Sequence, residues 1–189
     1  MFSFKYDDDV SLSLPLPDQD SEALYALVED SRTTLAQWLP WADQLRSADD
    51  EKEFLKTTLT HFGTGDSLNC VIRYRNQPVG MVSFNRIDKT HQHSEIGYWL
   101  GNQWHHKNIM QRAVTALLTI GFTEYNLRKI IINVDVNNDA SNHVAQKLNC
   151  HLDGTKREDI LYNNGKFADM NEWSLLRSEW EKQDKKSKE

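Results

Sequence analysis

The sequence predicts an α/β fold in which helices cover both faces of one mixed sheet. Segments rich in β-branched and aromatic residues alternate with segments whose apolar residues recur at helical spacing. A strand at residues 95–101 runs through a short polar loop into an amphipathic helix that begins at Ile109. Residues 128–136 form a nearly continuous β-branched run, which is typical of a central strand buried on both faces.

The N-terminal part of the chain predicts one strand and three helical segments. Residues 10–14 alternate apolar and polar side chains and run into two prolines, so they form a short strand that ends in a turn. An aspartate caps the helix that follows, and residues 32–39 form a second helical piece that Pro40 stops. Ser47 is the expected N-cap of the third helix, and a glycine ends that helix.

Strands dominate the rest of the chain. Turn residues divide them into two hairpins and two single strands, which helices connect. The expected strands are residues 67–74, 79–87, 95–101, 128–136, 150–162 and 167–176. Asn138 is the expected N-cap of the helix after the fourth of these strands. We expect one domain over residues 1–178 and a charged C-terminal tail over residues 179–189.

The composition restricts the class of function. The net charge of −6 argues against general nucleic-acid binding, because proteins of that class normally carry a basic face. No apolar run approaches the roughly 20 residues of a membrane span, and the N-terminus lacks a signal-peptide pattern. Cys70 and Cys150 lie in no CxxC or CxxH spacing, so we expect both to be buried, reduced side chains. A cytoplasmic enzyme or binding protein is therefore expected, with no nucleic-acid or membrane partner.

The strand, loop and helix that begin at residue 95 predict an anion site. The loop at residues 102–108 is polar and leads directly into the helix. The first amide N–H groups of a helix have no partner within the helix, and the helix dipole attracts negative charge to the same end. Phosphate groups commonly bind at such an end.

Several short motifs follow one another in this region. Residues 96–100 read IGYWL, 105–110 read HHKNIM, 138–141 read NDAS, 145–148 read AQKL, and 153–154 read DG. In this order they resemble the GNAT acyltransferases, and in particular the RimJ/RimL group, whose named members acetylate the N-terminal amine of ribosomal proteins. The closing segment NGKFADMNEWSLLRSEW resembles the last hairpin of the same family. The resemblance covers nearly the whole chain, and the order of the motifs is more specific than any one of them.

The resemblance implies a GNAT fold, with a mixed, mostly antiparallel sheet of about seven strands that is flanked by helices and splayed between strands 4 and 5. It also implies acetyl-CoA as the donor and direct attack by an amine in a ternary complex. The favoured acceptor is a protein N-terminal α-amine, as on ribosomal proteins, and the alternative is a polyamine, amino sugar or amino acid. An open groove past Trp41 would favour a peptide, and a closed acidic pocket would favour a polyamine. A homodimer is expected by family analogy.

The phosphate loop departs from the family pattern Q/R-x-x-G-x-G/A. His105, Asn108 and Met110 occupy its defined positions, and His106 replaces a further glycine that this branch usually carries. Glycine serves such loops by adopting positive φ and by letting phosphate approach the backbone. Asparagine tolerates the left-handed backbone, so Asn108 is expected to preserve the turn, and Asn149 replaces glycine after a helix in the same way. The missing glycines also leave the alternative of a degenerate protein that only binds an acyl-CoA or acts as an interaction module.

The resemblance assigns cofactor binding mainly to the loop and the strand before it. The pantetheine arm of coenzyme A is expected to pair like an added strand along residues 99–101, where the sheet splays. A backbone N–H near Leu100 would hold the thioester oxygen as it becomes an oxyanion. The expected cofactor-binding residues are Trp99, Leu100, Gly101, His105, His106, Lys107, Asn108, Ile109, Met110, Asn133, Asn138 and Ser141.

Two side chains are candidates for the catalytic steps. Attack needs a neutral amine, and Glu95 is the candidate base; the alternative is an exposed carboxylate at a strand end. Ser141 is the candidate donor to the departing thiolate, by its match to the family motif; the alternative is a helix hydroxyl bonded to the backbone. Tyr98 and Tyr162 are expected to pack rather than to react.

No metal site is expected. The pairs His91/His93 and His105/His106 invite a metal ion, but no third ligand stands at a recognisable spacing. Solvated loop histidines are therefore the favoured interpretation. Neither pair supports a nucleophile of the Cys/His or Ser/His/Asp kind, so the reaction is expected to proceed without a covalent enzyme intermediate.

Overall fold

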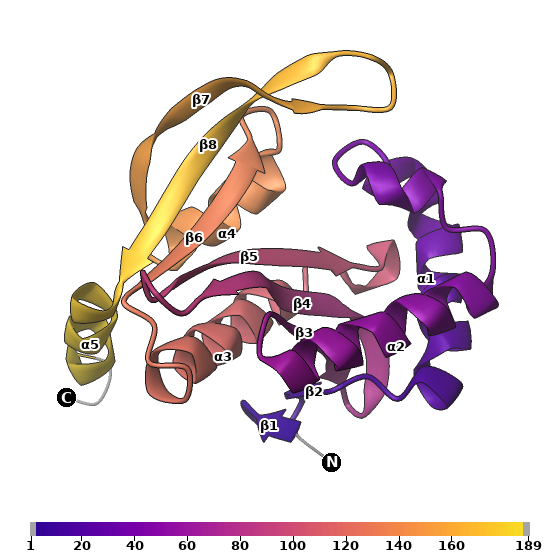
Figure 1. The fold of residues 1–189 in the computed structure, drawn as a ribbon, viewed down its shortest axis with the longest axis horizontal. Helices are drawn as coiled ribbons and strands as arrows, with labels where there is room; N and C mark the ends of the chain where they lie inside the picture. Colours follow the sequence, from indigo (N-terminus) through magenta and orange to yellow (C-terminus); the bar gives the residue numbers. More distant parts are fainter. Residues whose placement is uncertain (1–2, 187–189) are drawn as a thin grey trace.

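One continuous sheet of eight strands organises residues 3–186, the part of the chain that the computed structural model describes. The strands are β1 (Ser3–Lys5), β2 (Val10–Ser13), β3 (Leu68–Tyr74), β4 (Gln77–Asp88), β5 (His93–Leu100), β6 (Lys129–Asp135), β7 (His151–Leu161) and β8 (Phe167–Leu176). The helices are α1 (Pro17–Leu35), α2 (Ala48–Thr64), α3 (Ile109–Thr123), α4 (Asp139–Lys147) and α5 (Arg177–Lys186), with short 3-10 turns η1 (Pro40–Asp43) and η2 (Asn102–Trp104). The strand order is β1-β2-β3-β4-β5-β6-β8-β7, and all neighbours are antiparallel except β5 and β6 (Figure 1). The predicted α/β class and mixed, mostly antiparallel sheet are confirmed.

The parallel pair β5–β6 joins the two halves of the sheet over a short distance. Its three register pairs are His93 with Lys129, Ser94 with Ile130, and Glu95 with Ile131. Beyond them the strands separate. Counted from the strand at Val10, β5 and β6 are the fourth and fifth strands, so the predicted position of the splay is confirmed. The expected number of strands is one too low, because β1 has only three residues and shows too little pattern to be recognised.

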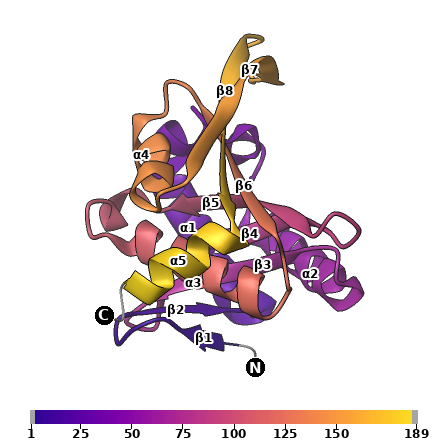
Figure 2. The ribbon, with the colours of Figure 1, turned by 90° about the vertical axis from the view of Figure 1, so that its left-hand side faces the viewer.

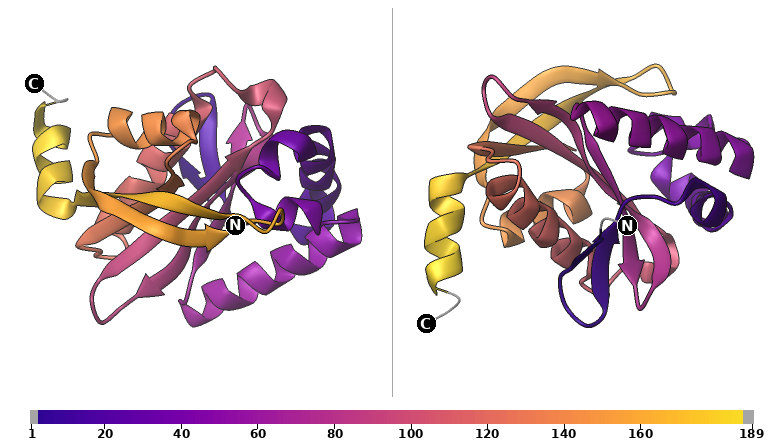
Figure 3. Two further views of the ribbon diagram at one scale, coloured as in Figure 1. Left: turned by 90° about the horizontal axis from the view of Figure 1, so that it is seen from above. Right: turned by 60° about the horizontal axis from the view of Figure 1, so that its bottom comes forward.

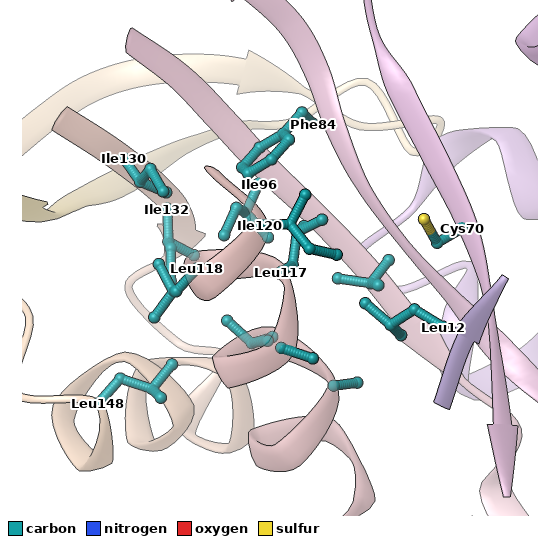
Figure 4. Packing of buried hydrophobic residues seen from close by; sticks show 14 of the residues in the cluster. Leu12, Cys70, Phe84, Ile96, Leu117, Leu118, Ile120, Ile130, Ile132 and Leu148 are labelled. Atoms are coloured by element: carbon teal, nitrogen blue, oxygen red, sulfur yellow. The ribbon is translucent and has the colours of Figure 1, made fainter. Parts of the chain in front are cut away.

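Helices cover both faces of the sheet. α1 and α2 lie on one face, and α3 and α4 lie on the other (Figures 2 and 3). The larger buried cluster lies on the α3 side and includes Phe84, Ile96, Leu117 and Ile132, whose side chains Figure 4 shows between the helix and the strands. A smaller cluster on the α1 side contains Trp99. The central strands are therefore buried on both faces, as their long apolar runs require.

The boundaries of the predicted helices match the structure except at α1, and α5 is a helix that the sequence did not predict. Ser47 caps α2, with its Oγ accepting from the Asp50 N–H at 3.1 Å, and Gly65 ends that helix with φ of +72°. α1 is one helix from Pro17 to Leu35, so the separate piece predicted at residues 32–39 is wrong. The residue before α1 is Leu16 rather than an aspartate, and the proline at the first helical position supplies a suitable φ instead of a side-chain cap.

The C-terminal helix α5 packs on the end of α3. The rings of Trp180 and Phe122 lie 5.3 Å apart between centroids. The Arg177 guanidinium donates to the Phe122 carbonyl at 2.7 Å and to the Leu127 carbonyl at 2.9 Å. The expected charged tail from residue 179 is therefore helical as far as Lys186, and residues 187–189 lie outside the described part of the chain.

The two cysteines behave as small apolar residues. Neither forms a disulfide within the described residues; Cys70 is fully buried and Cys150 half-buried. Burial raises the pKa of Cys70 to about 12, so its thiol stays protonated at neutral pH. No helix among residues 3–186 combines the length and the apolar character that crossing a membrane requires.

α2 carries a buried carboxyl group in its first turn. Glu51 is 3% exposed, and its Oε1 atom has no hydrogen-bond partner among the described residues. The helix N-terminus favours a negative charge at this position, but desolvation outweighs that preference. Burial raises the pKa of Glu51 to about 7, so this carboxyl titrates near neutral pH.

The long hairpin β7–β8 arches away from the sheet toward η1 (Figures 1 and 3). Register shifts interrupt its ladder between Leu152 and Gly154 and between Lys156 and Ile160, and such bulges bend a hairpin. At its tip the Asn163 side chain donates to the Pro40 carbonyl at 2.9 Å and to an Asp43 carboxylate oxygen at 3.2 Å. The hairpin tip and the turn after α1 are therefore in contact.

Candidate functional site

The opening between β5 and β6 exposes main-chain groups of β5. The Gly101 N–H donates to the Val79 carbonyl at 3.0 Å, and Trp99 lies two residues earlier on the same edge. Because main-chain groups alternate between the two edges of a strand, Tyr98 and Leu100 direct theirs away from β4 and toward the opening. An extended chain of amides could pair with that edge as an added strand. Of the residues 99–101 expected to pair with the pantetheine arm, only Leu100 therefore has main-chain groups that face the opening. Tyr98, which was not expected, also has main-chain groups that face it.

The loop before α3 adopts left-handed backbone at two of the three positions where the family pattern allows glycine, and the third, Met110, lies inside α3. φ is +60° at His106 and +57° at Asn108. The expectation that Asn108 preserves the turn is confirmed, and His106 adopts the same conformation despite its larger side chain. Asn149 after α4 has φ of +55°, as its position after a helix predicts.

The N-terminus of α3 faces this loop. Asn108 is the N-cap residue, and its side chain makes no capping hydrogen bond to a described residue. The amide N–H groups of the first turn therefore point out of the helix toward the loop. The Arg112 side chain, which belongs to α3, donates to the Lys107 and Asn108 carbonyls at 3.4 and 3.3 Å and so ties the loop to the helix. The Lys107 Nζ lies 4.5 Å from the centre of the Trp104 ring, so the loop also carries a cation. These groups suit an anion such as a pyrophosphate.

The left-handed backbone at residue 108 should affect the stability of the protein. Asn108→Ala is expected to lower the free energy of unfolding by about 1 kcal/mol, because alanine pays the full steric cost of positive φ. Asn108→Gly is the matched control, since glycine adopts this φ without that cost. Urea denaturation measures both variants. Equal stability of the alanine and glycine variants would contradict the prediction.

A hydrogen-bonded pair of hydroxyls lies on the α4 side of the opening. The hydroxyl of Tyr98 lies 2.8 Å from Ser141 Oγ, in the first turn of α4. Asn138 accepts from the Ser141 N–H at 3.1 Å, so its role as N-cap is confirmed. Burial raises the pKa of Tyr98 to about 12, and the hydrogen bond to Ser141 opposes this only partly. Tyr98 therefore makes a hydrogen bond as well as packing. Alternation along β5 places it on the same face as Ile96 and Leu100, and the sequence alone shows this alternation.

Glu95 is tied to β6 at the last register pair before the opening. Its Oε2 accepts from Asn133 Nδ2 at 2.8 Å. The Asn133 Oδ1 in turn accepts from Lys156 Nζ at 3.0 Å, and Lys156 pairs with Glu172 at 2.7 Å. Burial lowers the pKa of Lys156, but the hydrogen bond and the charge of Glu172 outweigh it, so the pKa is raised overall. Glu95 is thus a partly buried, oriented carboxyl group rather than a free strand-end side chain.

The hydroxyl pair and the carboxyl group lie on opposite faces of β5. Glu95 and Trp99 point to the α1 face, and Tyr98 points to the other. Trp41 is 38% exposed and packs edge-to-face on Trp99, with 6.0 Å between ring centroids. Trp41 therefore belongs partly to the core and also borders the face that carries Glu95. Asn133 shares that face, so its side chain lies away from the hydroxyl pair.

A second polar network braces the base of the hairpin. The Asn142 side chain donates to the Asp135 carbonyl at 2.9 Å and accepts from Trp173 Nε1 at 2.9 Å and from Asn171 at 3.0 Å. Tyr162 donates to the Asp135 carboxylate at 3.0 Å, and burial together with that carboxylate raises the pKa of Tyr162. These contacts join α4, β6, β8 and the turn after β7.

Comparisons with known proteins agree with this geometry. Residues 12–151 match the family model described as an acetyltransferase (GNAT) domain. YdaF of Bacillus subtilis (strain 168), which carries the provisional name of a ribosomal N-acetyltransferase, is 30% identical over 182 residues, covering 96% of this chain and 98% of that protein. The ribosomal-protein-serine acetyltransferase of Escherichia coli (strain K12) is 28% identical, over 81% of this chain and 85% of the relative.

A solved structure of the same family shares the fold. RimL, a ribosomal L7/L12 alpha-N-protein acetyltransferase in complex with coenzyme A, superposes with a TM-score of 0.88 at 25% sequence identity, covering 93% of this chain and 98% of that one. The similarity therefore covers almost the whole chain. The chain belongs to the GNAT acetyltransferase family and is an acetyl-CoA-dependent N-acetyltransferase.

Proposed function

We propose that this enzyme acetylates the α-amine at a protein N-terminus, by direct attack of the amine on the thioester in a ternary complex. The observation that carries the proposal is Glu95, an oriented and partly buried carboxyl group at the point where β5 leaves β6. The names of the Escherichia coli relative and of RimL assign acetylation of ribosomal proteins to those two proteins, which supports the same class of acceptor.

Coenzyme A is expected to lie along the opening and across the loop before α3. The first-turn amides of α3, together with the left-handed residues His106 and Asn108, would hold the pyrophosphate. The Leu100 N–H faces the opening and would stabilise the thioester oxygen as negative charge develops on it. His105 Nε2 lies 3.2 Å from the Leu100 carbonyl and would close that end of the pantetheine site.

The proposed reaction needs one proton acceptor and one hydrogen-bond donor. As the amine nitrogen bonds to the thioester carbon, Glu95 takes the amine proton directly or through a water molecule. The C–S bond then breaks, and the Tyr98–Ser141 pair donates a hydrogen bond to the thiolate. With a pKa of about 12, Tyr98 keeps its proton beside a thiol of ordinary pKa ~8.5, so it stabilises the leaving group without being consumed.

Charge near Glu95 favours an α-amine over a polyamine. An α-amine with pKa near 8 is neutral in roughly one molecule in ten at pH 7, whereas a lysine-like amine with pKa about 10.4 is neutral in fewer than about one in a thousand. One carboxyl group is a sufficient base for the first but a weak one for the second. Lys156 stands next in the chain of contacts from Glu95 and would repel a polycation.

An acceptor panel tests the proposal. The purified enzyme is incubated with acetyl-CoA and one of three acceptors: a peptide with a free N-terminus, the same peptide with a blocked N-terminus and an internal lysine, or spermidine. Mass spectrometry is expected to find one added acetyl group on the free N-terminus alone. Acetylation of spermidine without acetylation of the free peptide would contradict the proposal and favour the small-amine alternative.

Removing either hydroxyl of the Tyr98–Ser141 pair is expected to lower kcat by about 10–150-fold, the worth of one hydrogen bond to a charged group such as the departing thiolate. The two losses should not add, because each hydroxyl orients the other. Steady-state kinetics of Tyr98→Phe, Ser141→Ala and the double variant measures this. Full additivity would show that the two hydroxyls act independently, and unaltered turnover of Ser141→Ala would return Ser141 to a structural role and leave Tyr98 acting alone.

We also propose that one acetyltransferase domain spans residues 1–178 and that the enzyme is a cytoplasmic homodimer, the latter by family analogy. Light scattering coupled to size-exclusion chromatography is expected to give twice the chain mass of 22.0 kDa. A mass equal to one chain at micromolar concentration would contradict the dimer.

A further inference from the structure

The turn between β4 and β5 brings three metal-binding side chains together. Asp88 Oδ2 lies 3.0 Å from His91 Nδ1 and 3.5 Å from His93 Nε2. One ligand atom from each residue lies within 4.8 Å of the others. The expectation that His91 and His93 lack a third ligand is therefore wrong. Asp88 is the missing partner, and the sequence pattern did not identify it because the hairpin, not the spacing, turns its carboxylate toward both rings.

The distances suit a transition-metal ion. Zinc binds imidazole nitrogen and carboxylate oxygen at about 2.0–2.2 Å, so neighbouring ligand atoms of a tetrahedral site lie roughly 3.3 Å apart. The two distances from Asp88 Oδ2, 3.0 and 3.5 Å, bracket that value. The His91 side chain is 75% exposed, so its ring can rotate to complete the site without disturbing the core.

Main-chain contacts fix the shape of the turn independently of any metal. The second carboxylate oxygen of Asp88 accepts from the His91 N–H at 2.8 Å, and Asp88 is the register partner of His93 in the β4–β5 ladder. The Gln92 carbonyl accepts from the Arg128 N–H at 2.6 Å, which attaches the turn to the start of β6. A third ligand is thus held in place before a metal ion arrives, which reduces the ordering cost of binding.

The nearby lysines are engaged elsewhere. Lys89, inside the turn, directs its Nζ to the Thr64 carbonyl at 3.2 Å, at the end of α2. Lys129, the register partner of His93, pairs with Asp153 at 2.6 Å. Neither ammonium group therefore takes the place that a cation would occupy between Asp88 and the two rings.

We propose that Asp88, His91 and His93 form a binding site for a divalent transition-metal ion of the zinc type, with water completing the coordination. Two imidazoles and one carboxylate favour zinc, nickel or copper over magnesium or calcium, which prefer oxygen ligands alone. The site lies at the opposite end of β5 from Leu100. Its role is to clamp the β4–β5 turn beside the short β5–β6 ladder, and it stands independently of the acceptor proposed above.

Isothermal titration calorimetry with zinc chloride tests the site, using tag-free, chelator-treated full-length protein without coenzyme A. One saturable equivalent is expected. Asp88→Asn and His93→Gln should each weaken binding at least as much as loss of an outer-shell partner does, about 10–100-fold. His151→Gln is the matched control, because His151 also contacts an aspartate, Asp153, at 2.9 Å but belongs to no such group of three among residues 3–186. This variant should bind zinc as the parent does.

Thermal unfolding gives a second readout. Zinc is expected to raise the Tm of the parent protein and of His151→Gln, but not that of Asp88→Asn, because a ligand stabilises the state that binds it. Circular dichroism confirms that each variant is folded. The proposal is overturned if the parent shows no saturable heat with zinc up to ~100 μM, or if Asp88→Asn binds as tightly as the parent.

Discussion

Glu95→Gln is expected to lower kcat/KM for an N-terminal peptide by about 10²–10⁴-fold at neutral pH, the usual contribution of a positioned general base. Glutamine preserves the shape of the side chain and the acceptor atom for Asn133, so the position of the residue is retained. The loss should shrink above pH ~8, because the α-amine is then mostly neutral in solution and the base has only the proton released on attack left to accept. Initial rates of thiol release between pH 6 and pH 9 measure this dependence.

A neighbouring carboxyl group supplies the control. Glu172→Gln removes a charge from the same chain of contacts, but Glu172 contacts Lys156 and Lys129 rather than Asn133. Its pH profile should therefore keep the shape of the parent profile. Binding of coenzyme A, measured by calorimetry, should be unaltered in Glu95→Gln. If Glu95→Gln retains the parent rate at every pH, Glu95 is not the base.

Stability should depend on pH through the buried carboxyl of α2. The pKa of Glu51 is raised from 4.5 to about 7 by burial, so the folded protein disfavours the ionised form. The stabilisation is fully present below about pH 4.5 and is lost as pH rises through about 7, because the unfolded chain then ionises more readily. At pH 8 and above the loss is about 3 kcal/mol.

Glu51→Gln should remove this dependence. The variant is expected to be about 3 kcal/mol more stable than the parent at pH 8 and equal to it near pH 4.5, as measured by urea denaturation across that range. Glu53→Gln is the matched control on the same helix, because Glu53 is exposed and pairs with Lys56 at the surface. If the free energy of unfolding depends on pH in the same way for the parent and for Glu51→Gln, ionisation of the Glu51 carboxyl does not destabilise the folded protein.

Local signals predicted most of the fold. Ser47 and Asn138 were recognisable as N-caps because capping depends on a few adjacent residues. The end of α1 could not be recognised in this way, because contacts between residues farther apart in the sequence determine it. The Arg32 side chain donates to the carbonyls of Ala42 and Leu45 and holds the following segment against the helix. That tertiary contact overrides the helical pattern of residues 32–39.

In the candidate site, too, some features follow from local sequence and others depend on contacts between distant residues. Left-handed backbone at Asn108 follows from the chemistry of one side chain, so the sequence could predict it. The Tyr98–Ser141 and Glu95–Asn133 contacts join residues 43 and 38 positions apart, and no local pattern shows them. The family resemblance supplied Ser141 and the loop, but which face of β5 each side chain occupies required the register of the sheet.

The short β5–β6 ladder has a consequence for folding cooperativity. Three register pairs are the whole parallel ladder between the strands up to β5 and the strands from β6 onward, so main-chain hydrogen bonds couple the two halves weakly and the core under α3 carries most of their coupling. Acetyl-CoA bound in the opening between β5 and β6 would pair with the edge of β5 beyond the three register pairs. The cosubstrate would thereby connect the two halves of the sheet where β5 and β6 do not. Hydrogen exchange of the β6 amides is accordingly expected to slow when coenzyme A binds, while exchange at the β3–β4 ladder changes little.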